Sequence, residues 1–157
     1  MSAWEYKLFT KDLFGLIVSS NKARDISGEN ISDALEYVNQ NNYINSNLSH
    51  SMNVFEGMGK CSFVSTVVFF SFDQPKLNTN KNWKHRTFRE NSNTIISDST
   101  SEPGVDLLIE CLNYAKDWIN RFEIDLFTIS HNIEVYRNYF YSTTLASVTI
   151  FYQGNKV

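Results

Sequence analysis

The sequence has few cysteines, and they are not paired. Its 157 residues include only Cys61 and Cys111, and neither has a second Cys or a His at the spacing of a metal or redox motif. This usage is typical of a reduced compartment, where both side chains are expected to be small buried groups. A disulfide between them is the less favoured alternative.

Long apolar runs are also absent. The longest, Val67 to Phe70, is far shorter than the roughly 20 residues needed to cross a bilayer. The opening stretch "MSAWEYKLFTKDLF" is interrupted by charge and lacks the features of a signal peptide. We therefore expect a soluble protein that is made in the cytoplasm and has no membrane partner.

The chain has no excess of positive charge. Its formal net charge is -3 and its pI is near 5.6. Such a chain has no general field that would attract nucleic acid or an anionic membrane. We expect its partners to be recognised by local surface instead.

A catalytic or metal-binding constellation is equally hard to find. His50, His85 and His131 have no second His at ligand spacing, so no metal site is predicted, and each is expected to be a surface or turn histidine. The stretch "EGMGKCS" departs from a phosphate-binding loop, because Val54 and Cys61 stand where that loop needs Gly and a hydroxyl residue. The sequence predicts no catalytic, metal-binding or cofactor-binding residue, and a protein that is not an enzyme.

What the sequence does contain is enough apolar and aromatic material for one folded domain over residues 1–157. Hydrophobic residues make up 42% of the chain and aromatic residues 15%. Ser2 and Glu5 have the spacing of a capping box and a helical period follows them, which predicts a helix from Ala3 to Ser19. The residues of that period are Tyr6, Phe9, Leu13 and Ile17.

The segment from Ser20 to Lys60 is rich in Asn and Ser and has few large apolar residues. Only Ile31, Leu35 and Val38 suggest a short helix, with Ser32 as its cap. The rest is expected to be an extended arm, either flexible or ordered by assembly. A segment of this length without regular structure is uncommon inside a compact domain.

The next stretch, "CSFVSTVVFFSFD", predicts a central strand because both of its faces carry apolar groups. The segment from Trp83 to Phe88 is expected to return as its antiparallel partner in a hairpin.

The clearest element is a helix from Val105 to Phe122. Its apolar residues recur at helical spacing and form a wide face, so the helix is expected to lie across a sheet. Ser99 and Glu102 have capping-box spacing, and Pro103 suits the first turn. Acidic residues here, including Asp106, are explained by the helix dipole rather than by catalysis.

Three further strands are predicted, in "IDLFTIS", "IEVYRNYFY" and "TTLASVTIFYQ". In the last of them Leu145, Ser147, Thr149 and Phe151 share one face. These elements indicate an α+β fold: a two-layer sandwich of a mostly antiparallel sheet with a long helix packed on it, an N-terminal helix and the extended arm.

Basic and aromatic residues are concentrated in the predicted hairpin. This window is a solvated loop, a protein contact or a nucleic-acid contact, and the acidic chain argues against the last of these. Of the two binding roles we expect a protein interface. Its candidate residues are Lys76, Lys81, Trp83, Lys84, Arg86 and Arg89.

The second half of the chain resembles a known family in the order of its features. A loop with "SDST" precedes the helix from Val105 to Phe122, a short strand carries "FTI", and a final strand from Thr144 to Tyr152 alternates Thr with apolar residues. This arrangement resembles the neck and tail-terminator ring proteins of tailed bacteriophages, particularly those infecting Bacteroidetes, including the crAss-like group. The chain departs from the pattern where "TTLAS" replaces a Gly and an aromatic, and residues 20–60 have no counterpart in it.

The resemblance implies a structural virion protein of the head-tail connector, neck or tail terminator, without a cofactor. Its partners would be further copies of itself in a sixfold or twelvefold ring, and the phage structural proteins on the portal side and the tail side. DNA would pass through the lumen without specific binding. The alternative is a small cytoplasmic inhibitor or immunity-type interaction protein with an α+β sandwich, because fold does not imply function.

Overall fold

The computed structural model describes eight elements of secondary structure. The described residues are 3–15, 20–56, 60–73, 82–95, 104–124, 127–137 and 141–153. In chain order the elements are β1 (Glu5–Gly15), α1 (Ser20–Asn41), β2 (Asn45–Glu56), β3 (Lys60–Ser71), β4 (Trp83–Ile95), α2 (Val105–Arg121), β5 (Phe127–Arg137) and β6 (Tyr141–Gln153).

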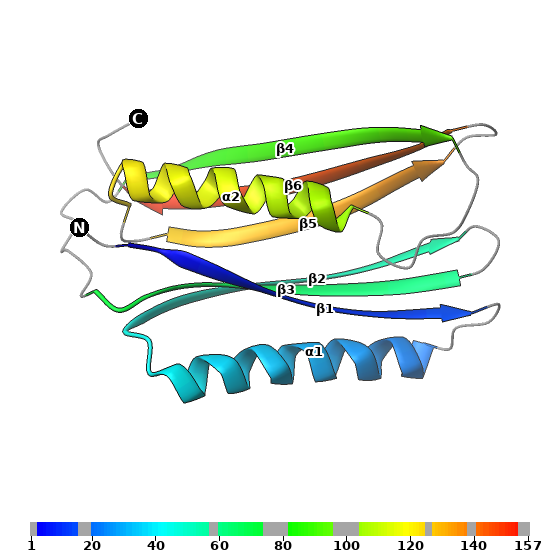
Figure 1. The fold of residues 1–157 in the computed structure, drawn as a ribbon, viewed down its shortest axis with the longest axis horizontal. Coiled ribbons are helices and arrows are strands. Elements are labelled where there is room, and N and C mark those ends of the chain that lie inside the picture. Colours follow the sequence, from blue (N-terminus) through cyan, green and yellow to red (C-terminus); the bar gives the residue numbers. More distant parts are fainter. Residues whose placement is uncertain are drawn as a thin grey trace.

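The strands form two separate antiparallel sheets, so the fold is α+β with two sheets and two helices (Figure 1). The first sheet has the order β1-β3-β2 and the second has the order β4-β6-β5. In each sheet the last strand in the sequence lies in the centre and pairs with both neighbours.

The two halves of the chain repeat one topology, strand–helix–strand–strand. Their strand registers also agree. In the first sheet Phe9 and His50 flank Thr66 on one rung. The corresponding rung of the second sheet has Phe88 and His131 on either side of Val148.

Aligning these rungs also aligns the amino-acid sequence. "LSHSMNVF" in β2 falls on "ISHNIEVY" in β5, and Trp4 falls on Trp83. The same register places Phe69 of β3 on Phe151 of β6. We infer that the molecule consists of two copies of one structural unit.

The helices follow the same alignment. Asn42 and Glu123, each just beyond the end of its helix, both adopt a left-handed conformation with φ 52°. Superposing these two residues places Ala34 of α1 on Ala115 of α2, and both alanines are fully buried.

Aromatic contacts under the two helices correspond as well. Tyr37 of α1 packs against Phe9 and Phe70, with ring centroids 5.6 and 5.9 Å apart. The equivalent contacts in the second half, at 6.2 and 4.8 Å, join Trp118 of α2 to Phe88 and Tyr152.

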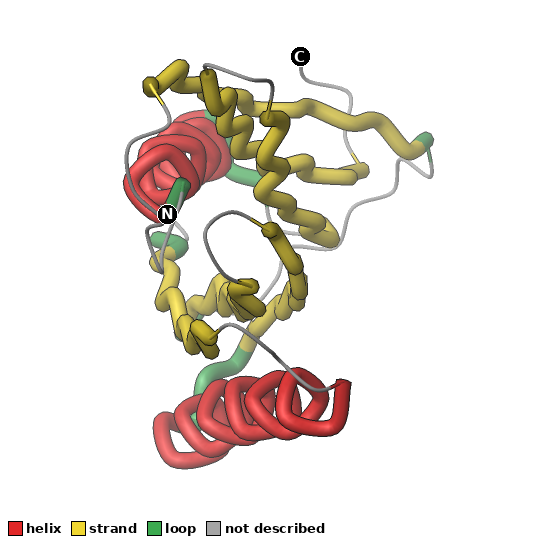
Figure 2. Tube along the Cα trace, turned by 90° about the vertical axis from the view of Figure 1, so that its right-hand side faces the viewer, coloured by secondary structure: helices red, strands yellow, loops and turns green. Residues whose placement is uncertain are grey.

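The two units stack in the same direction rather than facing each other. Helix α1 covers one face of the first sheet, and the opposite face of that sheet packs against β5 and the flank of α2 (Figures 1 and 2). Helix α2 lies over β4 and β6 on the inner face of the second sheet. The order through the molecule is therefore α1, first sheet, α2 with β5, and the rest of the second sheet.

The prediction for α2 is confirmed, because its buried residues form one stripe at helical spacing. They are Leu108, Cys111, Leu112, Ala115, Trp118 and Ile119. The central position of β3 is also confirmed. The proposed cap residues Ser99, Glu102 and Pro103 lie outside the described residues, and the helix begins after Gly104.

The predicted N-terminal helix is wrong, because residues Glu5–Gly15 form β1. Tyr6 and Phe9 fit a helical period, but they also lie on opposite faces of a strand whose two faces are both covered. Tyr6 packs against Phe69 toward the second sheet, and Phe9 packs against Tyr37 of α1. Because β1 pairs with β3 along its whole length, the segment forms a strand and not a helix.

The expected arm is also wrong, since this segment contains α1 and β2. The helix is longer than predicted, because the side that packs on the sheet consists largely of small and polar residues apart from Tyr37. Asn30 and Ala34 are buried there, and Asn30 donates hydrogen bonds to the Phe9 carbonyl at 3.1 Å and to Thr66 Oγ1 at 2.8 Å. A helix held in this way has no large apolar stripe in its sequence.

Two strand predictions need correction. The segment from Trp83 onward does not pair with β3, because both edges of β3 are occupied by β1 and β2, and β4 pairs with β6 in the other sheet. The two strands predicted between residues 124 and 141 are one strand, β5, which runs through His131 without a turn. The two-layer sandwich built on one long helix is thus replaced by two sheets with a helix each.

Candidate interaction surface

His131 is the most deeply buried histidine among the described residues, although a surface or turn position was predicted. Its Nδ1 lies 2.6 Å from Ser49 Oγ and its Nε2 lies 2.8 Å from Ser65 Oγ. Ser49 Oγ accepts the backbone N–H of His131, so its own proton can be donated to Nδ1, and Nε2–H then donates to Ser65. The ring joins the two sheets and has no free nitrogen for catalysis.

The environment of His131 keeps the ring neutral. Burial is the main cause that lowers its pKa, the charge of His50 adds to the shift, and a hydrogen bond at Ser65 opposes it, so that the pKa falls from 6.5 to about 4. A neutral ring held by two hydroxyls between packed sheets is a structural group.

His50, the equivalent residue in β2, is exposed and forms a second Ser–His contact. Its Nε2 lies 2.7 Å from Ser27 Oγ and its Nδ1 lies 2.8 Å from Thr66 Oγ1. Thr66 Oγ1 accepts from Asn30, so its own proton can be donated to Nδ1, and the ring proton then lies on Nε2. In this tautomer His50 donates to Ser27 and does not act as a base toward the serine hydroxyl. Partial burial lowers the pKa of His50.

The described part of the chain shows no metal cluster, because no three of its His, Cys, Asp or Glu side chains are placed to hold a metal ion. Neither α1 nor α2 combines the length and the hydrophobicity of a membrane-spanning helix. Cys111 is a free buried thiol whose pKa is raised to about 11, chiefly by burial.

The predicted basic interface is only partly described. Lys76 and Lys81 lie outside the described residues. The other four candidates lie on β4, at the edge of the second sheet, where strand alternation divides them between two faces. They are Trp83 and Arg89 on the outer face, and Lys84 and Arg86 on the helix side.

Arg86 has a packing role that the sequence did not indicate. Its guanidinium lies 5.6 Å from the ring centroids of both Phe88 and Trp118. Lys7, at the equivalent position of β1, lies 5.8 Å from the ring of Tyr37. In each unit, therefore, a cationic side chain from the first strand packs over the aromatic residue of the helix. Arg86 thus has a packing role within the chain besides any contact with a partner.

The outer face of the second sheet is an uncovered sheet surface in the described structure. No described element packs on it. Thr87 and Thr149 share a hydrogen bond of 2.9 Å across this face, and His85 lies beside Phe151. The face carries Trp83, His85, Thr87, Arg89, Asn91, Thr128, Ser130, Asn132, Glu134, Leu145, Ser147, Thr149 and Phe151. We call it the open face.

The sequence indicated one strand of the open face but not the face as a site. Alternation in the last strand correctly grouped Leu145, Ser147, Thr149 and Phe151 on one side. It could not show that this side is uncovered, because the covering of a strand depends on elements that are distant in the chain.

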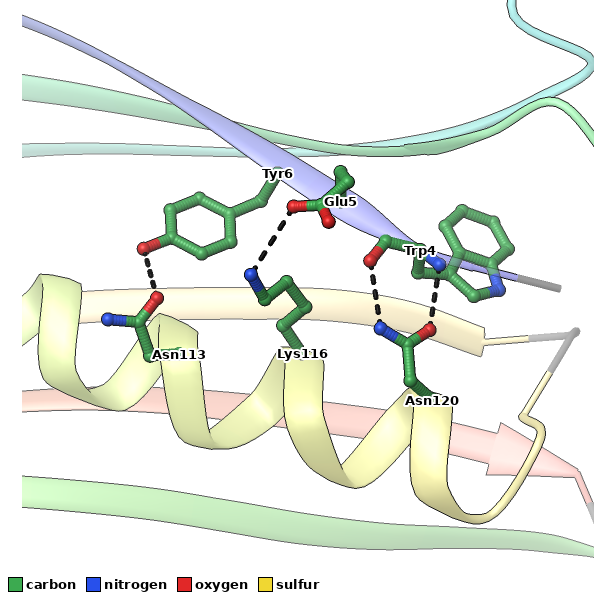
Figure 3. Close-up of polar contacts among 6 residues, drawn as sticks. All are labelled: Trp4, Glu5, Tyr6, Asn113, Lys116 and Asn120. Carbon is green, nitrogen blue, oxygen red and sulfur yellow. Dashed lines mark hydrogen bonds and ion pairs between the residues drawn. The ribbon is translucent and has the colours of Figure 1, made fainter.

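The corresponding face of the first sheet is buried in the contact between the two units. Three polar links fasten its edge to α2 (Figure 3). The Trp4 N–H donates to Asn120 Oδ1 at 2.7 Å, while Asn120 Nδ2 donates to the Trp4 carbonyl at 2.9 Å. The other links join Tyr6 OH to Asn113 Oδ1 at 2.7 Å and Lys116 Nζ to Glu5 Oε2 at 3.3 Å.

Aromatic packing completes this contact. Phe127 of β5 meets Trp4 edge-on at a centroid distance of 4.6 Å and lies 6.0 Å from Phe69. We call this contact between the two units the internal interface.

Comparison with known proteins gives no relative: no family model, curated protein or solved structure matches this chain.

Proposed function

We propose that this chain is a structural protein that works by assembly, and that the open face is its main contact surface. The observation that carries the proposal is the contrast between equivalent aromatic residues. Trp4 and Phe69 are 1% and 0% exposed in the first sheet, whereas Trp83 and Phe151 are 54% and 42% exposed in the second. Large apolar groups left uncovered at such positions are typical of protein contact sites.

The specific form of this proposal is a homo-oligomeric ring in the neck or tail of a tailed bacteriophage, with portal-side and tail-side proteins as further partners. The family resemblance of the second half supports it. The open face adds support, because a ring subunit needs an uncovered surface that matches its neighbour. DNA passing through such a ring is not expected to be bound specifically, given the net charge of -3.

The alternative is an inhibitor or immunity-type module that presents the same face to one foreign protein. Both proposals use the open face, but they differ in stoichiometry. An inhibitor would be a monomer that forms a one-to-one complex, whereas a ring subunit associates with itself.

The test combines light scattering after size exclusion with the Phe151→Asp variant. Wild type is expected to form species larger than a monomer, and a charge at this exposed position should weaken association about tenfold or more without unfolding the chain. Tyr114→Asp is the matched control, because Tyr114 is 51% exposed on α2 and lies outside the open face.

Particle incorporation tests the phage form directly. Tagged wild type and Tyr114→Asp should be recovered in purified virions, and Phe151→Asp should be depleted. A wild-type monomer that binds a single foreign partner one-to-one would contradict the ring and support the inhibitor.

A further inference from the structure

The internal interface shows how a contact between two chains could be formed. It joins unlike surfaces: the face of the first sheet turned away from α1, and the strip formed by β5 and the flank of α2. Because the two units are equivalent, each of these surfaces has a counterpart elsewhere in the molecule. The counterpart of the first is the open face.

The counterpart of the second surface lies on β2 and α1. The register places Leu48 on Ile129 and Met52 on Ile133, while the helix alignment places Leu35 on Lys116. Ile129 and Ile133 are buried in the internal interface. Leu48, Met52 and Leu35 are 38%, 47% and 46% exposed. We call these residues, together with His50, the β2 strip.

The exposed apolar residues are thus explained by position. Trp83 and Phe151 are at the positions equivalent to Trp4 and Phe69, which are buried on the first-sheet side of the internal interface. Leu48, Met52 and Leu35 are at positions equivalent to residues on the other side of that interface, formed by β5 and α2. The open face and the β2 strip lie on opposite sides of the stack of layers, so they cannot meet within one chain (Figure 2).

The buried Ser–His–Ser group has a complete counterpart divided between these two surfaces. Ser49 and Ser65, which hold His131, correspond to Ser130 and Ser147 on the open face. His131 corresponds to His50 in the β2 strip. In the single chain His50 contacts Ser27 and Thr66, so docking would exchange these hydroxyls for those of a neighbour.

We propose that the open face of one copy docks on the β2 strip of a second copy, repeating the internal interface between chains. This deepens the assembly role and rests on the proposed function. The contact is heterologous, since it joins two different surfaces, and such contacts propagate into rings or filaments rather than stopping at a symmetric dimer. The partner that fits both surfaces is therefore another copy of this chain.

Two variants, each blocking one surface, give a sharp test. Phe151→Asp blocks the open face and Leu48→Asp blocks the β2 strip, and both positions are exposed enough to leave the fold intact. Each variant alone is expected to be monomeric in light scattering. An equimolar mixture should form a heterodimer and nothing larger, because one intact open face and one intact β2 strip remain.

Tyr114→Asp is again the control and should associate like wild type. Circular dichroism of every variant should match that of wild type, and a Trp83→Ser and Met52→Ser pair repeats the test with smaller changes. In each mixture, one heterodimer is the expected result.

The outcomes separate this inference from the function on which it rests. If Leu48→Asp associates like wild type while Phe151→Asp does not, the open face pairs with something other than the β2 strip, which overturns the inference and leaves the assembly role standing. A mixture without heterodimer overturns it as well. A wild-type chain that stays monomeric at every concentration overturns both.

Discussion

At the scale of single residues, the two histidines show how position sets chemistry. His50 and His131 are equivalent in the repeated unit, yet one is exposed beside α1 and the other is sealed between the sheets. Hydroxyl groups occupy both ring nitrogens in each case. Because His131 is more deeply buried, protonation of its ring is less favourable than protonation of His50.

His131 should make folding stability depend on pH. Its pKa is about 4 in the folded chain and near 6.5 when unfolded. Its contribution is therefore fully present above about pH 6.5 and is lost as pH falls toward 4, by an amount on the order of 3 kcal/mol at most.

The measurement is denaturant unfolding between pH 7 and pH 4 for wild type and His131→Gln. The free energy of unfolding should fall more steeply with acid in wild type than in the variant, because Gln does not titrate. His50→Gln, at the exposed equivalent position, should keep most of the wild-type slope. Equal slopes for wild type and His131→Gln would refute the assignment.

At the scale of elements, the start of α2 depends on a glycine. Gly104 has φ 80°, and a Cβ added there would lie 2.7 Å from Thr144 Cγ2 and 2.8 Å from Ile133 Cγ2. The helix therefore enters its place on the sheet through a position that only glycine occupies without strain.

Two Gly→Ala substitutions should consequently have opposite effects. Gly104→Ala is expected to cost about 1–3 kcal/mol of unfolding free energy, from strain and contact with neighbouring side chains. Gly28→Ala, inside α1 with nothing within 4 Å of the added Cβ, should stabilise by about 0.5–1 kcal/mol. Chemical denaturation measures the change in unfolding free energy for both variants. Effects of equal sign would contradict either the expected strain at Gly104 or the expected gain at Gly28.

How far each element could be predicted depended on how its buried side is made. Helix α2 was predictable because large apolar residues such as Leu112 and Trp118 mark one face. For α1 the sequence predicted only a short helix around Ile31, Leu35 and Val38, because Asn30 and Ala34 form much of its buried side, and polar or small residues give no apolar period. Strand β1 was misread because residues such as Tyr6 and Phe9 satisfy both periods until a pairing partner is known.

The repeat itself was present in the sequence. Leu48-Ser49-His50 and Ile129-Ser130-His131 match residue for residue in type, and Trp4 and Trp83 stand at equivalent positions, Trp4 directly before β1 and Trp83 at the start of β4. Such self-similarity at a fixed spacing is the sequence signature of a repeated unit. The open face could not be found in the same way, since exposure depends on how the two units stack.

At the scale of the whole molecule, the tryptophans at equivalent positions should respond very differently to truncation. Trp4 is buried between the units, packed on Phe127 and fixed by Asn120. Trp4→Ala should destabilise the chain by about 3–5 kcal/mol. Trp83→Ala should change stability by less than about 0.5 kcal/mol in dilute solution, where the open face is uncovered.

Thermal and denaturant unfolding of the two variants measure this contrast. The loss in Trp4→Ala should appear in one shared transition, because Trp4 joins both halves. A variant in which only one half melts early would show that the internal interface contributes little to holding the units together.

Each chain would contribute two equivalent units to an assembly built from it. Along a head-to-tail array the joints would alternate between one inside a chain and one between chains. The joint inside a chain forms at a high effective concentration set by the connecting peptide, whereas the other depends on the protein concentration in solution. Dilution would therefore open every second joint only, and the array would come apart in pairs of units, never in single ones.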